Sequence, residues 1–181
     1  MSTAVRSKHL PESVLLASAC WAAAVGLELL HQILSVIMGF IDPADLQAAA
    51  RDAGAEEQLP VDAEQAVDLT VTASILLMGL LNVAIVTVLA VMLWLFVKKH
   101  RFAGGGRRLL MVFSLFLALR GLLVFAAQPA GTHVPEPLIL LDGSLQLIIA
   151  VAAVLGLIFA NQRETVEYTG ELEDTDDDKK Q

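Results

Sequence analysis

The sequence predicts an all-α membrane protein: a bundle of four transmembrane helices with a helical acidic loop outside and a disordered acidic C-terminal tail. Three observations support this prediction. The chain is 56% hydrophobic, whereas a soluble domain is usually about 45–50% apolar. Its apolar residues form four long runs, each with the roughly 20 residues that a helix needs to cross a bilayer. Its basic residues are shared unevenly among the connections between these runs.

The four apolar runs define the domain organisation. We expect transmembrane spans at residues 13–41, 69–97, 109–127 and 138–160. The first run follows a short basic stretch and so resembles a secretory signal peptide. Because its apolar sequence continues far beyond Cys20, we expect an uncleaved span instead.

Lysine and arginine predict the orientation. Five of them lie in "KKHRFAGGGRR", residues 98–108, and the N-terminal segment 1–12 is also basic. The connections 42–68 and 128–137 contain only Arg51. Because cytoplasmic connections carry the excess of lysine and arginine, we expect a multi-pass plasma-membrane protein with both termini in the cytoplasm. The run "AGGGRR" lacks the lysine and hydroxyl residue of a phosphate-binding loop, so we interpret it as a flexible basic turn.

The connection 42–68 is acidic. We expect one helix that starts at Asp42-Pro43 and stops near Gly54, and a second that starts at residues 62–65 and runs into the second span. The carboxylates of this loop greatly outnumber its single arginine: Asp42, Asp45, Asp52, Glu56, Glu57, Asp62, Glu64 and Asp68. A solvated acidic surface is the simplest interpretation, and a calcium site or a basic partner are the alternatives.

The C-terminal segment 161–181 is polar and acidic. It has too few large apolar residues to bury a core, so we expect it to be disordered from about Gly170.

Polar residues inside the apolar runs form the candidate site: Glu28, His31, Gln32, Arg120, Asp142 and Gln146. A helix rises about 1.5 Å per residue, which places Glu28, Arg120 and Asp142 in one layer of the outer half of the bilayer. On the first and fourth spans the members lie three or four residues apart and so share a face. A lone arginine in hydrocarbon costs at least about 2.5–3.5 kcal/mol. We therefore expect the charges to face inward, with Arg120 paired to Glu28, to Asp142 or to both.

Three roles are open for this polar cluster. Polar contacts between membrane helices add roughly 0.6–2 kcal/mol and fix helix register, which is a structural role. A proton or ligand site open to the outer face is the second, and a contact surface for another membrane protein is the third. Ser35 extends the polar face of the first span, and Asn82 of the second span lies nearer the membrane midplane.

Two pairs of small residues predict close helix packing. Ala22 with Gly26 and Ala152 with Gly156 have four-residue spacing, which lets helix backbones approach one another.

Motifs for catalysis or cofactor binding are incomplete. Glu28-Leu-Leu-His31 has the Glu-x-x-His spacing of di-iron bundles, which need a second such motif and two further glutamates. Haem ligation would need a second histidine at the depth of His31, and His133 in the outer connection is the candidate. No nucleophile is paired with a base. We expect a chain that is not an enzyme and that uses no cofactor, no metal and no nucleic acid.

The whole chain resembles the small four-span membrane proteins of actinobacteria. The features that carry this resemblance are the Ala/Val/Leu-rich spans, the long acidic loop led by Asp-Pro, the basic "KKHRFAGGGRR" and the tail "DTDDDKKQ". Some such proteins are accessory subunits of the respiratory supercomplex that joins a cytochrome bcc complex to an aa3 oxidase. The resemblance, which is architectural, implies a non-catalytic accessory or scaffolding subunit of a larger integral membrane complex. A small transporter or channel that uses the layer of Glu28, Arg120 and Asp142 is the alternative.

The orientation can be tested by cysteine labelling in sealed cells. In a Cys20→Ser background, Ala55→Cys and Thr132→Cys should react with a membrane-impermeant maleimide, whereas Gly104→Cys should react only after the cells are opened. Labelling of position 104 from outside would reverse the predicted orientation.

Overall fold

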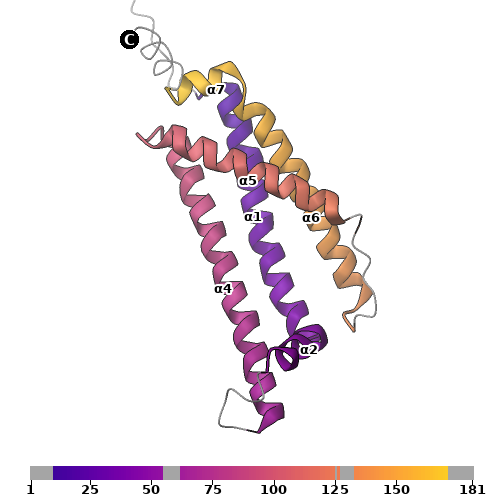
Figure 1. Cartoon of the computed structure of the whole chain (residues 1–181). Coiled ribbons are helices and arrows are strands. Elements are labelled where there is room, and N and C mark those ends of the chain that lie inside the picture. Colours follow the sequence, from indigo (N-terminus) through magenta and orange to yellow (C-terminus); the bar gives the residue numbers. More distant parts are fainter. Residues whose placement is uncertain (1–9, 55–61, 125, 127–132, 171–181) are drawn as a thin grey trace, which may run out of the picture.

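The computed structural model describes residues 10–54, 62–124, 126 and 133–170. All regular secondary structure in these ranges is helical (Figure 1), so the predicted all-α class is confirmed: α1 Glu12–Ile41, α2 Ala44–Asp52, α4 Ala63–Val97, α5 Ala103–Val124, α6 Glu136–Ala160 and α7 Arg163–Tyr168.

Three of the helices, α1, α4 and α6, are long and apolar enough to cross a membrane. The predicted third span, residues 109–127, overlaps α5, which begins earlier, at Ala103. α5 contains Arg107, Arg108 and Arg120. With these three arginines, α5 is not among the helices that are apolar enough to cross a membrane, and a fourth span remains a prediction.

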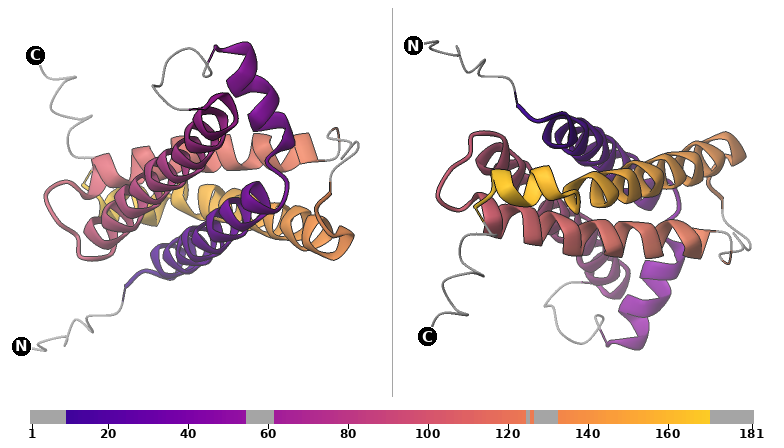
Figure 2. Two further views of the ribbon diagram at one scale, coloured as in Figure 1. Left: turned by 90° about the horizontal axis from the view of Figure 1, so that it is seen from below. Right: turned by 90° about the horizontal axis from the view of Figure 1, so that it is seen from above.

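The four long helices pack in a ring. α1 contacts α4 and α6, and α5 contacts the same two helices. Figure 1 shows α1, α4 and α6 running lengthwise while α5 crosses them obliquely, and the end-on views of Figure 2 show α5 extended across the bundle. α5 begins beside the end of α4, because only residues 98–102 separate the two helices. Its inclination then carries it along α6.

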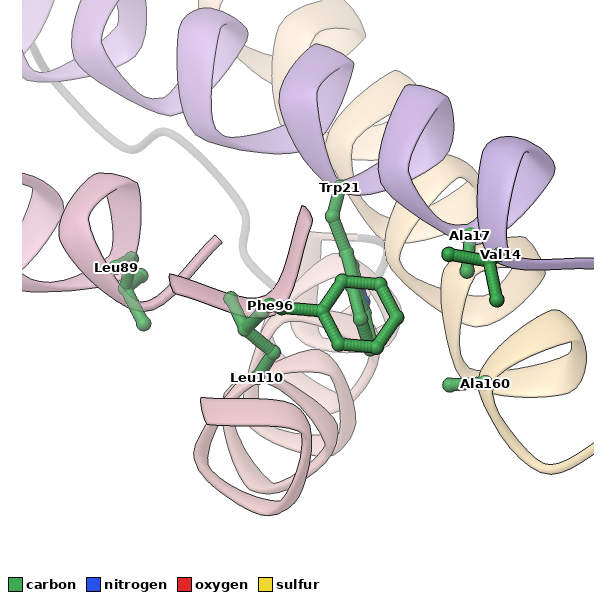
Figure 3. Packing of buried hydrophobic residues seen from close by; sticks show 7 residues of the cluster. All are labelled: Val14, Ala17, Trp21, Leu89, Phe96, Leu110 and Ala160. Carbon is green, nitrogen blue, oxygen red and sulfur yellow. The ribbon is translucent and has the colours of Figure 1, made fainter. Parts of the chain in front are cut away.

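The main hydrophobic core joins the long helices near the junction of α4 and α5 (Figure 3). Its buried members are Val14, Ala17, Trp21, Leu89, Phe96, Leu110 and Ala160. The rings of Trp21 and Phe96 meet edge to face, with their centroids 5.3 Å apart. The indole N–H of Trp21 donates to Ser114 Oγ at 2.9 Å. Because the polar atom of the indole is satisfied, this large side chain can be buried without a desolvation penalty.

The two pairs of small residues have different surroundings. Gly156 is buried, and a Cβ atom there would lie 2.6 Å from Cδ1 of Trp21. Ala22 and Gly26 lie on the exposed face of α1, and a Cβ at Gly26 would meet nothing within 4 Å. Close packing inside the bundle therefore uses Gly156, while the α1 pair faces outward.

The segment "AGGGRR" is helical, which corrects its interpretation as a flexible turn. The predicted loop 98–108 ends at Phe102, because α5 begins at Ala103. A Cβ at Gly106 would lie 3.0 Å from the carbonyl oxygen of Met92, so the missing side chain lets α5 approach α4. Arg107 is buried and donates to the carbonyl oxygen of Ala160 at 3.0 Å, at the C-terminal end of α6. A cation there offsets the negative end of the helix dipole.

The acidic connection begins with α2 and ends in α4. α2 starts at Ala44, after Pro43, and Gly54 follows it with a positive φ of 73°. Asp42 is not a simple helix cap, because its Oδ2 accepts the backbone N–H of His133 at 2.6 Å. This hydrogen bond holds the pKa of the Asp42 carboxyl below its usual value. The rest of the acidic loop, residues 55–61, lies outside the described residues.

The start of the C-terminal segment forms a helix that the sequence analysis did not predict. Thr165 of α7 is buried and donates to Ser13 Oγ at 3.0 Å. Tyr168 donates to the carbonyl oxygen of Val97 at 2.9 Å, and burial raises the pKa of its hydroxyl. α7 thus ties the ends of α1 and α4 to α6. The predicted disorder from Gly170 onward falls on residues 171–181, outside the described residues.

The glycine contacts predict opposite effects of one added methyl group. Gly156→Ala should destabilise the bundle by about 1–3 kcal/mol, because the indole of Trp21 must move away from Ser114. Gly26→Ala should leave stability unchanged or raise it by up to about 1 kcal/mol through helix propensity. Thermal unfolding in detergent, followed by tryptophan fluorescence, measures both variants, and equal melting temperatures would contradict the packing.

Candidate functional site

The first part of the polar cluster is an ion pair between α1 and α5. Arg120 donates through Nη1 to Glu28 Oε1 at 2.7 Å and through Nη2 to Glu28 Oε2 at 2.5 Å. The side chain of Glu28 is 6% exposed and that of Arg120 is 22% exposed. Gln32 donates to Glu28 Oε1 at 2.6 Å. This two-pronged geometry is the strong form of an arginine–carboxylate contact, and both carboxylate oxygens are occupied by it.

The second part joins α1 to α6. His31 Nδ1 lies 2.6 Å from Asp142 Oδ1, and one of these two atoms carries the shared proton. Gln146 donates to Asp142 Oδ2 at 2.7 Å from one turn further along α6. Both oxygens of this buried carboxylate therefore have partners. α1 contributes to both parts, because Glu28 and His31 are three residues apart on one face.

Close backbone packing places Arg120 beside α6. A Cβ atom at the next residue, Gly121, would collide with Cβ of Ala150, and the carbonyl oxygen of Gln146 lies 3.5 Å from the same point. The glycine thus lets α5 and α6 touch where the arginine leaves α5. The sequence analysis did not single out Gly121; its position next to the only arginine of an apolar run is the signal that could have identified it.

The structure brings the six predicted polar residues together and divides them into two hydrogen-bonded groups. Arg120 pairs with Glu28, while the described partners of Asp142 are His31 and Gln146. His133, the second candidate for haem ligation, lies in the connection between α5 and α6, beside Asp42 and with its side chain 81% exposed. Among the described residues no group of three or more His, Cys, Asp or Glu side chains is placed to hold a metal ion.

A cavity of about 590 Å³ adjoins the ion pair, between α1, α4 and α5. Its polar wall consists of Glu28, His31, Gln32, Ser35, Asn82 and Arg120. A second cavity, of about 570 Å³, lies on the α6 side of Arg120 and reaches Asp142 and Gln146. Arg120 therefore stands between two cavities, with its Nε atom buried and without a hydrogen-bond partner in the described part of the chain.

No protein-family model, curated protein or solved structure matches this chain. What the chain can do therefore has to follow from its own residues: the two buried pairs, the cavities beside them and the exposed faces of the helices.

Removing the arginine of the Glu28–Arg120 pair should destabilise the protein more than removing both charges of the pair. Arg120→Leu leaves the buried Glu28 carboxylate without its cation, which typically costs about 3–5 kcal/mol. Adding Glu28→Gln removes the stranded charge and keeps a side chain that can bond Gln32, so it should restore part of the stability.

Arg163→Leu is the matched control. The pair that Arg163 makes with Glu167 is exposed, with the two side chains 86% and 50% accessible, so its loss should change stability by less than about 1 kcal/mol. Denaturation in detergent gives the comparison. A double variant that unfolds as easily as Arg120→Leu alone would contradict the pairing.

Proposed function

We propose that the chain is a non-catalytic accessory or scaffolding subunit of a larger plasma-membrane complex. The observation that carries this proposal is the outward face of α1. Ala19, Ala22, Ala23 and Gly26 are all exposed there, and Gly26 has open space above it. Small residues at this spacing let a second membrane helix approach the backbone closely.

This face differs from the other exposed apolar surfaces. α4 exposes large side chains such as Leu77, Leu80 and Trp94, which lipid chains can cover as well as a protein can. A strip of small residues gains little packing energy when lipid chains cover it. Its advantage is realised when another helix packs against it, because helix association in membranes depends on such close van der Waals contact.

The charged segments fit the same proposal. With the orientation expected from the basic residues, the acidic connection 42–68 lies outside and the acidic segment 161–181 lies in the cytoplasm. One soluble partner could not contact both, whereas a complex that crosses the membrane could. Charges at the rim of an interface guide association more than they hold it. The resemblance to small actinobacterial membrane subunits makes a respiratory complex the first assembly to test.

A small transporter or channel is the second candidate, and the cavities favour it. Glu28 and Arg120 line a cavity of about 590 Å³, and Arg120 and Asp142 line the next. Transport through this layer would require the Glu28–Arg120 pair to open. Loss of transport by a Glu28→Gln variant that still assembles normally would favour the transporter, whereas loss of the folded protein itself would favour a structural role for the pair.

Solubilisation of native membranes in mild detergent tests the accessory role. The tagged 19.4 kDa chain should migrate with a much larger assembly on a native gel. Gly26→Leu should reduce co-purification of the other subunits about tenfold, which corresponds to about 1.4 kcal/mol of lost contact, without unfolding the bundle. Deleting residues 170–181 should weaken the association only modestly.

Ala90→Leu on the exposed face of α4 is the matched control for Gly26→Leu and should co-purify normally. A protein that runs alone as a monomer or small homo-oligomer would overturn the accessory role and favour the transporter.

A further inference from the structure

Two polar side chains in the cavity between α1, α4 and α5 have no partner in the described part of the protein. Ser18, Ser74 and Ser114 each donate their hydroxyl to the carbonyl four residues earlier in the helix, but Ser35 makes no such bond. Asn82, on the facing helix α4, is half-buried and also makes no described hydrogen bond. Both residues line the cavity of about 590 Å³. Unpaired polar groups among apolar helices are costly, so a ligand that bonds them would be stabilised.

We propose that this cavity binds a neutral, lipid-soluble molecule whose hydroxyl or carbonyl head reaches Ser35 and Asn82. The charges in the polar wall argue for a neutral head. Glu28 and Arg120 already neutralise each other through two hydrogen bonds. An ionic ligand would have to break that pair or remain uncompensated in a low dielectric, whereas a hydroxyl or carbonyl needs only neutral donors and acceptors.

The rest of the cavity suits an apolar body. Its other lining residues are Ile85, Val86, Leu89, Val112, Phe113, Phe116 and Leu117. The rings of Phe113 and Phe116 meet edge to face, with their centroids 6.4 Å apart. A mostly apolar wall with a few converging polar groups is the usual composition of a small-molecule site, and the volume falls within the usual range of about 300–1,000 Å³.

The ligand would enter from the side. Ile85 on α4 and Val112 and Phe116 on α5 line the cavity and are 38%, 66% and 55% exposed. The rim is therefore formed by apolar side chains on the outer surfaces of two adjacent helices, a surface that suits hydrocarbon. Because α5 crosses the bundle obliquely (Figure 1), it leaves this space between itself and α4. Binding here does not depend on whether the chain is an accessory subunit.

Photolabelling of the full chain in phosphatidylcholine nanodiscs tests the proposal. The probe is a long-chain fatty alcohol with a diazirine in its chain and a terminal alkyne. Two matched probes carry the same chain and end in a methyl group or a carboxylate. The alcohol should label residues of the cavity, located by mass spectrometry, more strongly than either matched probe, and unlabelled fatty alcohol should compete.

Variants separate recognition of the head from simple filling of space. Ser35→Ala and Asn82→Leu should each lower labelling by the alcohol about three- to tenfold, the effect of one neutral hydrogen bond. Thr87→Val is the control, because Thr87 is exposed on the same helix and does not line the cavity. Ile85→Trp at the rim should block labelling, whereas Val88→Trp, one turn away and outside the cavity, should not.

Specific outcomes would overturn the proposal. Equal labelling by the methyl-terminated probe, or no effect of Ser35→Ala and Asn82→Leu in variants that melt normally, would mean that lipid chains alone fill the space. Stronger labelling by the carboxylate probe would mean that the head is anionic. Labelling outside the cavity that Ile85→Trp does not change would mean that the alcohol binds elsewhere.

Discussion

The rest of the structure depends on the ion pair between Glu28 and Arg120. An arginine among apolar helices needs a partner that meets its charge in good geometry, and here both terminal nitrogens of Arg120 bond the two oxygens of Glu28. The pair joins α5 to α1, two helices that otherwise pack mainly against α4 and α6. It therefore closes the ring of helices from inside and sets where α5 can cross.

Close packing and polar contacts act together at this crossing. Gly121 lets α5 touch α6 beside Ala150, and Gly156 makes room for Trp21 where α6 packs against α1. The polar contacts between His31 and Asp142 then fix α6 against α1. α5 packs against α6 at Gly121 and bonds α1 through Arg120. It leaves the space on its α4 side unfilled, and the cavity beside the ion pair lies there. The same constraint that stabilises the bundle thus creates its candidate binding site.

The sequence predicts much of the fold because its constraints are local. Helix rise and the cost of buried charge are enough to place Glu28, Arg120 and Asp142 at one depth. These two rules cannot decide which carboxylate pairs with Arg120. That choice depends on the rotation of α5 about its axis, and the contact of Gly121 with α6 sets this rotation. The sequence predicts a loop position for Arg107, because a basic residue beside a run of glycines usually lies in a loop. Its burial against the end of α6 is a tertiary contact, which no local pattern shows. The cavity likewise depends on the inclination of α5, which no sequence pattern predicts.

Exchange of the two charges tests the central interaction most directly. Glu28→Arg and Arg120→Glu each place two like charges together in a low dielectric, so each single variant should fail to accumulate as a folded protein in the membrane. The double exchange restores an opposite pair between α1 and α5. It should recover a substantial part of the folded protein, measured by size-exclusion chromatography of the solubilised chain. A double exchange that accumulates no better than either single variant would contradict the account.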